Sequence, residues 1–180
     1  MNEYIVELQT IAENAHKEFG RLSAEQLNWR PNAESWSVGQ CFEHLIKTNE
    51  LFFDELDKIA AGTRKNSFWE NWSPFTSLGG KFLIKSLKSD QRKFKAPTPK
   101  IVPPSNVDPG IIEAFGRHQA ELIRKINGTV NADRRKVVVT SPFVAVMTYS
   151  LADGLTVIVE HEKRHFRQAE RVRAADGFLR

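Results

Sequence analysis

Apolar residues recur every three or four positions in four long stretches of the chain. This spacing places them along one face of an α-helix, with polar residues on the opposite face. It predicts amphipathic helices over residues 3–20, 37–60, 109–127 and 150–174. A shorter helix is predicted over 78–94 and a single turn over 24–27. The fold class that best accounts for this pattern is all-α, with one helical-bundle domain over residues 1–180.

Two of the long helices have clear start signals. Ser37 is a good N-cap, and Gln40 three positions later completes a capping box. Trp36 precedes the cap, where an apolar side chain can pack back onto the first turns of the helix. Ser150 begins the last helix, and Asp153 can replace the usual capping-box partner.

Three stretches interrupt the helical pattern and are predicted to be long connections. Residues 62–77 set Phe68, Trp69, Trp72 and Phe75 among loop-forming residues. We expect these aromatics to plug the open end of the core, although they could instead line or cover a pocket. Residues 95–109 contain five of the eight prolines, which predicts an extended crossover strap. Residues 129–149 contain a valine run that is too short and isolated to predict a sheet.

The composition is that of a globular domain with 41% apolar and 27% charged residues among its 180 positions. No apolar run approaches the roughly 18 residues that a membrane-spanning helix needs. The N-terminus lacks the basic and then apolar layout of a secretion signal, so we expect a cytoplasmic protein with no membrane partner. Cys41 is the only cysteine, so a metal would be bound by nitrogen and oxygen with at most one sulfur.

The net charge is +4, and basic residues become denser towards the end of the chain. Such a surface can attract nucleic acid or another anion, but a charged face of this size is usually solvated. No recognisable nucleic-acid-binding module accompanies it. Anion or nucleic-acid binding is therefore only a third hypothesis.

The strongest chemical signal is His161-Glu162-Lys163-Arg164-His165 in the last helix. Two histidines four residues apart lie on one helix face, where both imidazoles can reach one metal ion. The stretch also matches the H-E-x-x-H pattern of zinc proteases. Those enzymes need a further ligand downstream, and only residues 166–180 follow, with Arg171 at the position where a third histidine would stand. Glu162 is rotated by about 100° from His161, so we expect it in an exposed or inter-helix salt bridge.

A third ligand can instead come from upstream. His44 lies on the inner stripe of the predicted helix over 37–60, and helical bundles commonly build metal sites from facing helices. Three imidazoles leave coordination positions open, as in catalytic sites. Possible supporting residues are Gln168, one turn beyond His165, and His118, on the core side of the helix over 109–127. Cys41, one turn before His44, could approach the metal, but a small buried core residue is the favoured interpretation.

Three segments together resemble the DinB/YfiT-like family of metalloenzymes. They are Trp36-Ser37-Val38-Gly39-Gln40, Phe42-Glu43-His44-Leu45 and His161-Glu162-x-x-His165-x-x-Gln168. The resemblance covers nearly the whole chain. It implies a four-helix bundle in up-down-down-up order, with one additional short helix and long crossover loops in this chain. It also implies a divalent metal on three histidines, which correspond to His44, His161 and His165.

The resemblance further implies a relation to transferases and isomerases that use low-molecular-weight thiols, namely bacillithiol, mycothiol or glutathione. Our first hypothesis is therefore a metal-dependent enzyme that activates water or a thiol, either a thiol S-transferase or isomerase or a small-molecule hydrolase. Zinc or nickel is favoured and iron is compatible. The alternative is a non-catalytic bundle in which the metal or the histidines only join helices. A homodimer fits the family, and the sequence does not identify the substrate.

Overall fold

The computed structural model describes residues 2–72, 76–89, 98–144 and 147–179, and in these ranges the chain is mostly helical. No helix within those ranges is both long and apolar enough to cross a membrane. The elements are α1 (Asn2–Phe19), α2 (Ala24–Asn28), α3 (Val38–Glu50), α4 (Phe53–Ala60), α5 (Phe68–Trp72), α6 (Thr76–Lys88), the 3₁₀-helix η1 (Pro99–Ile101), α7 (Ile111–Gly128), β1 (Val138–Thr140), β2 (Thr148–Ser150) and α8 (Leu151–Arg173).

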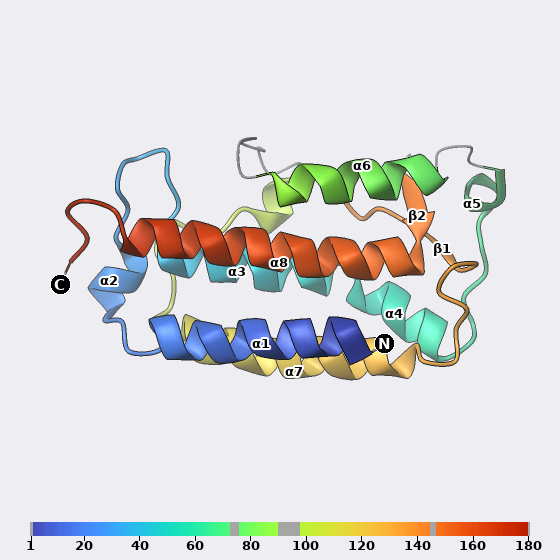
Figure 1. Ribbon diagram of the computed structural model, residues 1–180, viewed down its shortest axis with the longest axis horizontal. Helices are drawn as coiled ribbons and strands as arrows, with labels where there is room; N and C mark the ends of the chain where they lie inside the picture. Colours follow the sequence, from blue (N-terminus) through green and yellow to red (C-terminus); the bar gives the residue numbers. More distant parts are fainter. Residues whose placement is uncertain (1, 73–75, 90–97, 145–146, 180) are drawn as a thin grey trace.

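The long helices run side by side along the length of the molecule (Figure 1). Helix α8 packs against α3, α1 and α6, while α7 packs against α1, α3 and α4. Helix α6 also contacts β2 at the end of the molecule where the two strands lie (Figure 1). Helix α8 therefore touches elements from the first half of the chain on several sides, and its histidines can meet residues far away in sequence.

The predicted helix starts are confirmed at Ser37 and Ser150. The Ser37 side chain accepts a hydrogen bond from the Gln40 backbone N–H, and the Gln40 side chain accepts one from the Ser37 N–H. The Ser150 hydroxyl accepts from the Asp153 N–H. Helix α7 begins at Ile111 after Gly110, two residues later than predicted, because Asp108 forms a turn with Gly110. The predicted ends of the other long helices lie within one or two residues of those observed.

The prediction of one continuous helix over 37–60 is wrong. Helix α3 ends at Glu50 and α4 begins at Phe53. The Phe52 N–H bonds to the carbonyl of Asn49, three residues back, so one turn is tightened and the chain changes direction. Apolar spacing continues across this turn, with Leu45, Phe52 and Leu56 all buried, and so the periodicity did not reveal the break.

Two connections also differ from their predictions. Strands β1 and β2 pair antiparallel, with Val139 opposite Tyr149, so the valine run does form a small sheet. Both residues are buried, which shows that the pairing is stabilised by the core beneath it. Helix α6 begins at Thr76, earlier than the predicted 78, and the predicted residues 90–94 of this helix and 95–97 of the strap lie outside the described residues.

The prediction that the aromatic residues of 62–77 plug the open end of the core is wrong for the two whose side chains are described, Phe68 and Trp72. Phe68 and Trp72 are 78% and 75% exposed, and their rings stack on each other in α5. They point to solvent because the adjacent Glu70 is buried and holds that face of α5 inward. Phe75 and the Trp69 side chain lie outside the described part of the structure.

A layer of buried polar side chains divides the core into two apolar clusters. The first cluster surrounds Phe19, Phe42 and Phe115. The second surrounds Leu122 and Leu155 and extends to the strands. We call the residues between them the polar layer: His44, Thr48 and Asn49 of α3, His118 and Gln119 of α7, and Glu162 and His165 of α8.

Complete capping boxes are present at the start of α2, at Ser23, and at the start of α3, at Ser37. Comparing them tests how much a helix start contributes to the stability of the fold. Replacing Ser37 with Ala should lower the free energy of unfolding by about 1 kcal/mol or more, because a buried cap leaves backbone N–H groups without a partner. Ser23→Ala is the matched control, since Ser23 caps the five-residue α2 at an exposed position. Guanidinium denaturation of both variants measures the effect. A loss in S37A no larger than that in S23A would contradict the expectation.

Candidate metal centre

The three histidines singled out in the sequence lie together between α3 and α8. His44 comes from the middle of α3, and His161 and His165 lie one turn apart on α8. One ring nitrogen from each histidine can be chosen so that all three lie within 4.8 Å of one another. The Nε2 atoms of His44 and His161 are 3.3 Å apart. His44 and His165 are only 4% and 8% exposed, while His161 is partly exposed.

A backbone carbonyl fixes the orientation of the His44 ring. The Nδ1 atom of His44 lies 2.8 Å from the carbonyl oxygen of Ile101 in η1. Only a protonated Nδ1 can donate to that oxygen, so the Nε2 lone pair of the neutral ring faces the other two histidines. The Thr48 hydroxyl, one turn further along α3, lies 3.4 Å from the same Nε2. This arrangement is the usual one for a histidine that binds a metal through one ring nitrogen.

The other two histidines contain buried nitrogen atoms without a protein partner. The Nδ1 atoms of His161 and His165 are both buried, and neither has a hydrogen-bond partner among the described residues. Three neutral rings whose nitrogens converge place lone pairs close together, which is unfavourable unless a proton or a cation lies between them. A divalent ion that accepts imidazole nitrogen fits this donor set.

Burial keeps all three rings neutral near pH 7. The pKa of His44 is lowered by burial and by the charge of Lys47, and the hydrogen bond to Ile101 opposes this only in part. The pKa values of His161 and His165 are lowered well below the usual range, first by burial and then by neighbouring histidines and Arg164. The lone pairs that a metal requires are thus available at neutral pH.

Trp36 covers one side of the histidine cluster. Its ring centroid lies 4.7 Å from that of His44 and 5.6 Å from that of His165, and it is nearly parallel to the His165 ring. Trp36 also packs against the first apolar cluster. It therefore joins the start of α3 to the site and shields the histidine rings from solvent on that side.

The described part of the strap, from residue 98 onward, lies along α2 and α3 and is bound by their side chains. Four side chains hydrogen-bond to its backbone carbonyl groups: Asn28 to Val107, Gln40 to Pro104, His44 to Ile101 and Lys47 to Val102. Asn28 also accepts from the Val107 N–H, at 2.7 Å. Gln40, His44 and Lys47 lie one turn apart on α3, so the face that carries the histidine also binds the strap.

Glu162 does not form the exposed or inter-helix salt bridge predicted for it. The residue is fully buried, and its carboxylate accepts hydrogen bonds from the side-chain amides of Asn49 on α3 and Gln119 on α7. Burial raises its pKa to about 8, although the two amide hydrogen bonds oppose the shift. The 100° rotation that separates Glu162 from His161 directs it into the centre of the molecule, where it connects three helices.

The remaining sequence candidates have different surroundings. The Gln168 side chain interacts with His165, and this hydrogen bond partly offsets the lowering of the His165 pKa. His118 stacks on Phe53 at 5.2 Å and is not part of the three-histidine cluster. Cys41 belongs to the first apolar cluster, and burial raises its pKa to about 12, so it is a neutral thiol. The supporting roles suggested for these three residues stay predictions.

Sequence reasoning did not identify Thr48, Ile101 or the packing of Trp36 on the histidines. Thr48 stands four residues after His44, a spacing that could have suggested the contact. Trp36 lies two turns before His44 and was interpreted only as a helix-start residue. The role of Ile101 depends on its carbonyl group, which has no sequence signature.

The buried carboxyl of Glu162 gives a prediction for the pH dependence of stability. Its pKa is about 8 in the folded chain and near 4.5 when exposed, so the folded state binds more protons between these values. The contribution of Glu162 to stability should therefore fall as pH rises from about 4.5 to about 8. Because each pKa unit corresponds to about 1.4 kcal/mol, the fall attributable to Glu162 should amount to a few kcal/mol.

Glu162→Gln should remove this contribution and gain stability relative to the unsubstituted protein as pH rises from 5 to 9. Denaturation of both proteins in EDTA over that range measures the difference. A parallel pH dependence of the two proteins would show that burial does not shift this pKa as stated.

Comparison with known proteins agrees with the geometry of the site. The family model described as DinB superfamily matches residues 7–169, a range that contains all three clustered histidines. No curated protein and no solved structure matches the chain. The matched range spans most of the chain and the resemblance in the sequence points to the same family. The chain therefore belongs to the DinB superfamily, a metal-binding superfamily.

Proposed function

We propose that His44, His161 and His165 bind one divalent metal ion and that the protein is a metal-dependent enzyme acting on a small molecule. The observation that carries the proposal is the convergence of three neutral imidazoles, each of which offers one ring nitrogen within 4.8 Å of the other two. When bound, the ion would supply Lewis-acid chemistry that lowers the pKa of a water or thiol at an open coordination position.

The residues around the cluster would orient the ligands and restrict access of water. Ile101 holds the His44 ring so that Nε2 faces the cluster. Trp36 covers the His44 and His165 rings on one side. His161 is the most exposed of the three histidines, so a substrate would approach from its side. Three protein ligands leave room for a reacting group, which is typical of catalytic rather than structural sites.

We expect zinc or nickel as the bound ion, with iron as a compatible third candidate. Imidazole nitrogen suits all three ions, and no sulfur ligand from the chain joins the cluster. The sole cysteine, Cys41, is fully buried in the apolar core. A thiol that reacts at this site would therefore have to be a small external molecule.

The reaction class we favour is transfer or isomerisation that uses a low-molecular-weight thiol, with hydrolysis of a small molecule as the second possibility. The thiol reaction is favoured by the family resemblance. The first alternative outside catalysis is a metal that only joins α3 to α8, because the ligands come from these two packed helices. A structural ion of that kind would contribute to the stability of the fold.

The arrangement of the long helices supports the topology implied by the family. We infer a four-helix bundle of DinB type formed by α1, α3 with α4, α7 and α8, because these helices pack on one another. The homodimer, the cytoplasmic location and the absence of nucleic-acid binding stay predictions.

Metal binding should depend on each of the three clustered histidines. Untagged protein is expected to bind one Zn²⁺ or Ni²⁺ per chain. Single replacement of His44, His161 or His165 by Ala should weaken binding by at least about 100-fold, because loss of an outer partner alone costs 10–100-fold. Isothermal titration calorimetry and elemental analysis measure affinity and stoichiometry.

His16→Ala is the control for this experiment, because His16 is exposed on α1 and should not affect binding. Unchanged affinity in all three cluster variants, or no binding by the unsubstituted protein, would refute the site. Melting temperatures of H44A and of the metal-loaded unsubstituted protein separate the two roles. A structural ion predicts a large loss of stability with H44A, whereas a catalytic ion predicts that the fold persists.

The thiol hypothesis predicts a direct spectroscopic change. With Co²⁺ in the site, addition of glutathione or another small thiol should produce a sulfur-to-cobalt charge-transfer band in the near ultraviolet. The matched hydroxyl compound, in which serine replaces the cysteine of glutathione, should not produce it. A cobalt spectrum unchanged by each thiol tested, while three-histidine binding is intact, would favour water as the activated group.

A further inference from the structure

A second feature of interest is a cavity of about 380 Å³ at the end of the molecule that carries the strands. It lies between α4, the segment that follows α4, the strands and the first half of α8. Part of its lining is apolar and consists of buried side chains from α4 and the residue before it, from β1 and from α8: Phe52, Leu56, Ile59, Val139, Leu151, Leu155 and Ile158. A cavity of this size and composition is in the range of small-molecule sites.

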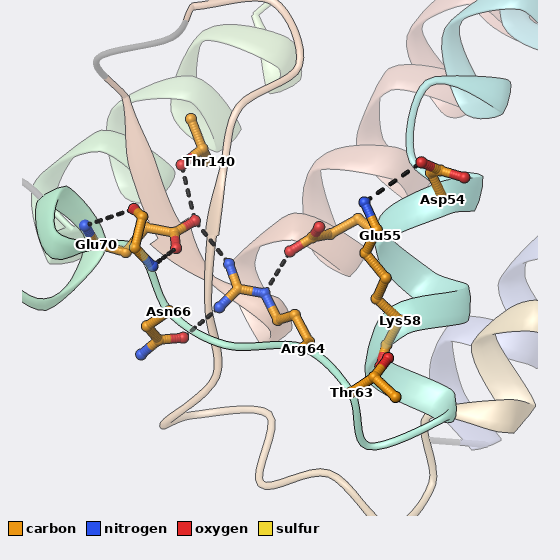
Figure 2. Close-up of polar contacts among 9 residues, drawn as sticks. Asp54, Glu55, Lys58, Thr63, Arg64, Asn66, Glu70 and Thr140 are labelled. Atoms are coloured by element: carbon orange, nitrogen blue, oxygen red, sulfur yellow. Dashed lines mark hydrogen bonds and ion pairs between the residues drawn. The ribbon is translucent and has the colours of Figure 1, made fainter.

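One wall of the cavity is polar and contains Arg64. Its guanidinium donates to Glu55, to Asn66 and, at 2.6 Å, to Glu70 (Figure 2). Glu70 also accepts from Thr140 at 2.8 Å and from the Ser67 N–H at 2.7 Å. The side chains of Arg64 and Glu70 are only 8% and 6% exposed, so the charges are held in fixed positions.

The charges that line the cavity balance. Asp54, Glu55 and Glu70 are acidic, and Lys58, Arg64 and Lys65 are basic. The most buried cation, Arg64, is already paired with two carboxylates and an amide. A ligand with a net charge would have to replace these contacts or place its charge without a partner beside the buried apolar side chains. An uncharged molecule with one hydrogen-bonding group and an apolar body would meet matching surfaces on both sides.

The cavity also lies beside the metal centre. Ile158 precedes His161 by one turn of α8, a rise of about 5 Å. On the other side, Leu51 follows Thr48 by one turn, and the Thr48 hydroxyl contacts His44. The residues that line the inner end of the cavity therefore continue the faces of α3 and α8 that bring the histidines together.

We propose that this cavity binds an uncharged small molecule with an apolar body and a hydrogen-bonding head. The apolar body packs against Leu155, Ile158 and Val139, and the head faces Thr140 and Arg64. Resting on the proposed function, we assign the cavity as the pocket for the substrate that reacts at the histidine cluster. This substrate is therefore a small, mainly apolar compound rather than a sugar phosphate, a nucleotide or a peptide.

Binding to the cavity is tested first without metal, so that the result does not depend on the proposed function. Benzyl alcohol is titrated into ¹⁵N-labelled protein in EDTA, and backbone amide shifts are recorded. The expected result is a saturable shift of amides that line the cavity, such as those of Val139, Leu155 and Ile158, with a Kd of about 1 mM, typical of so small a ligand. Benzylammonium and benzoate should bind at least about fivefold more weakly because they carry a charge.

Two substitutions that reduce the cavity give the matched test. Ile158→Phe adds volume at the inner end, and Thr63→Trp adds it at the exposed rim. Each should weaken benzyl alcohol binding by at least about tenfold, because the larger side chain would occupy space that the ligand needs. At Ile158 the closely packed neighbours also leave the new ring little room to move aside. Val6→Trp, at an exposed position of α1, is the control and should bind as the unsubstituted protein does. If I158F does not fold, T63W decides the result.

The link to the metal centre is tested with Co²⁺ in the histidine cluster. Bound benzyl alcohol should then show enhanced proton relaxation that is lost with Zn²⁺. The binding proposal is overturned if the cavity amides show no saturable shift, if the charged analogues bind as well, or if T63W and V6W bind equally. Binding without relaxation enhancement overturns the assignment as the substrate pocket, and failure to bind Co²⁺ refutes the metal centre instead.

Discussion

The structure depends on burying a set of polar side chains between two apolar clusters. Burial of a carboxyl group or an imidazole is unfavourable unless its hydrogen-bonding groups find partners. Glu162 meets this requirement through Asn49 of α3 and Gln119 of α7, so these three residues can pair only when three helices have one particular register. Apolar contacts in the two clusters tolerate small shifts of one helix along another, whereas the amide–carboxyl contacts do not. The polar layer thereby specifies how α8 sits against α3 and α7.

The three-histidine cluster lies at the edge of the same layer. Once Glu162 holds α8 in register, His161 and His165 face His44 across the seam between α8 and α3. The strap then fixes the orientation of the His44 ring, because the hydrogen bond from Nδ1 to the Ile101 carbonyl leaves Nε2 facing the cluster. Asn28 and Gln40 secure the strap at two further points. The position of the site thus results from contacts between residues more than forty positions apart in the chain.

The features that could be predicted from the sequence are those that depend on residues close together in the chain. The capping box at Ser37 and the four-residue spacing of His161 and His165 are local, and both were predicted correctly. The pairing of β1 with β2 and the burial of Glu162 depend on partners from distant segments, whereas the break between α3 and α4 was hidden because the apolar spacing continues across it. His44 was added to the site by the reasoning that bundles use facing helices and by the family resemblance. The role of the Ile101 carbonyl could not be predicted because a backbone group has no side-chain signal, and the exposure of Phe68 follows from the burial of Glu70 against the distant Thr140.

The H-E-x-x-H stretch therefore has a different meaning from the one its match suggests. In a protease the glutamate must lie beside the metal to act as a base. Here the helix directs the two histidines towards α3 and the glutamate towards both α3 and α7, so the residues that match one motif serve two purposes. The glutamate positions the helix, and the histidines on the neighbouring face are free to bind a ligand. The face of α8 that carries the histidines continues one turn further to Ile158, which lines the cavity at the strand end of the molecule.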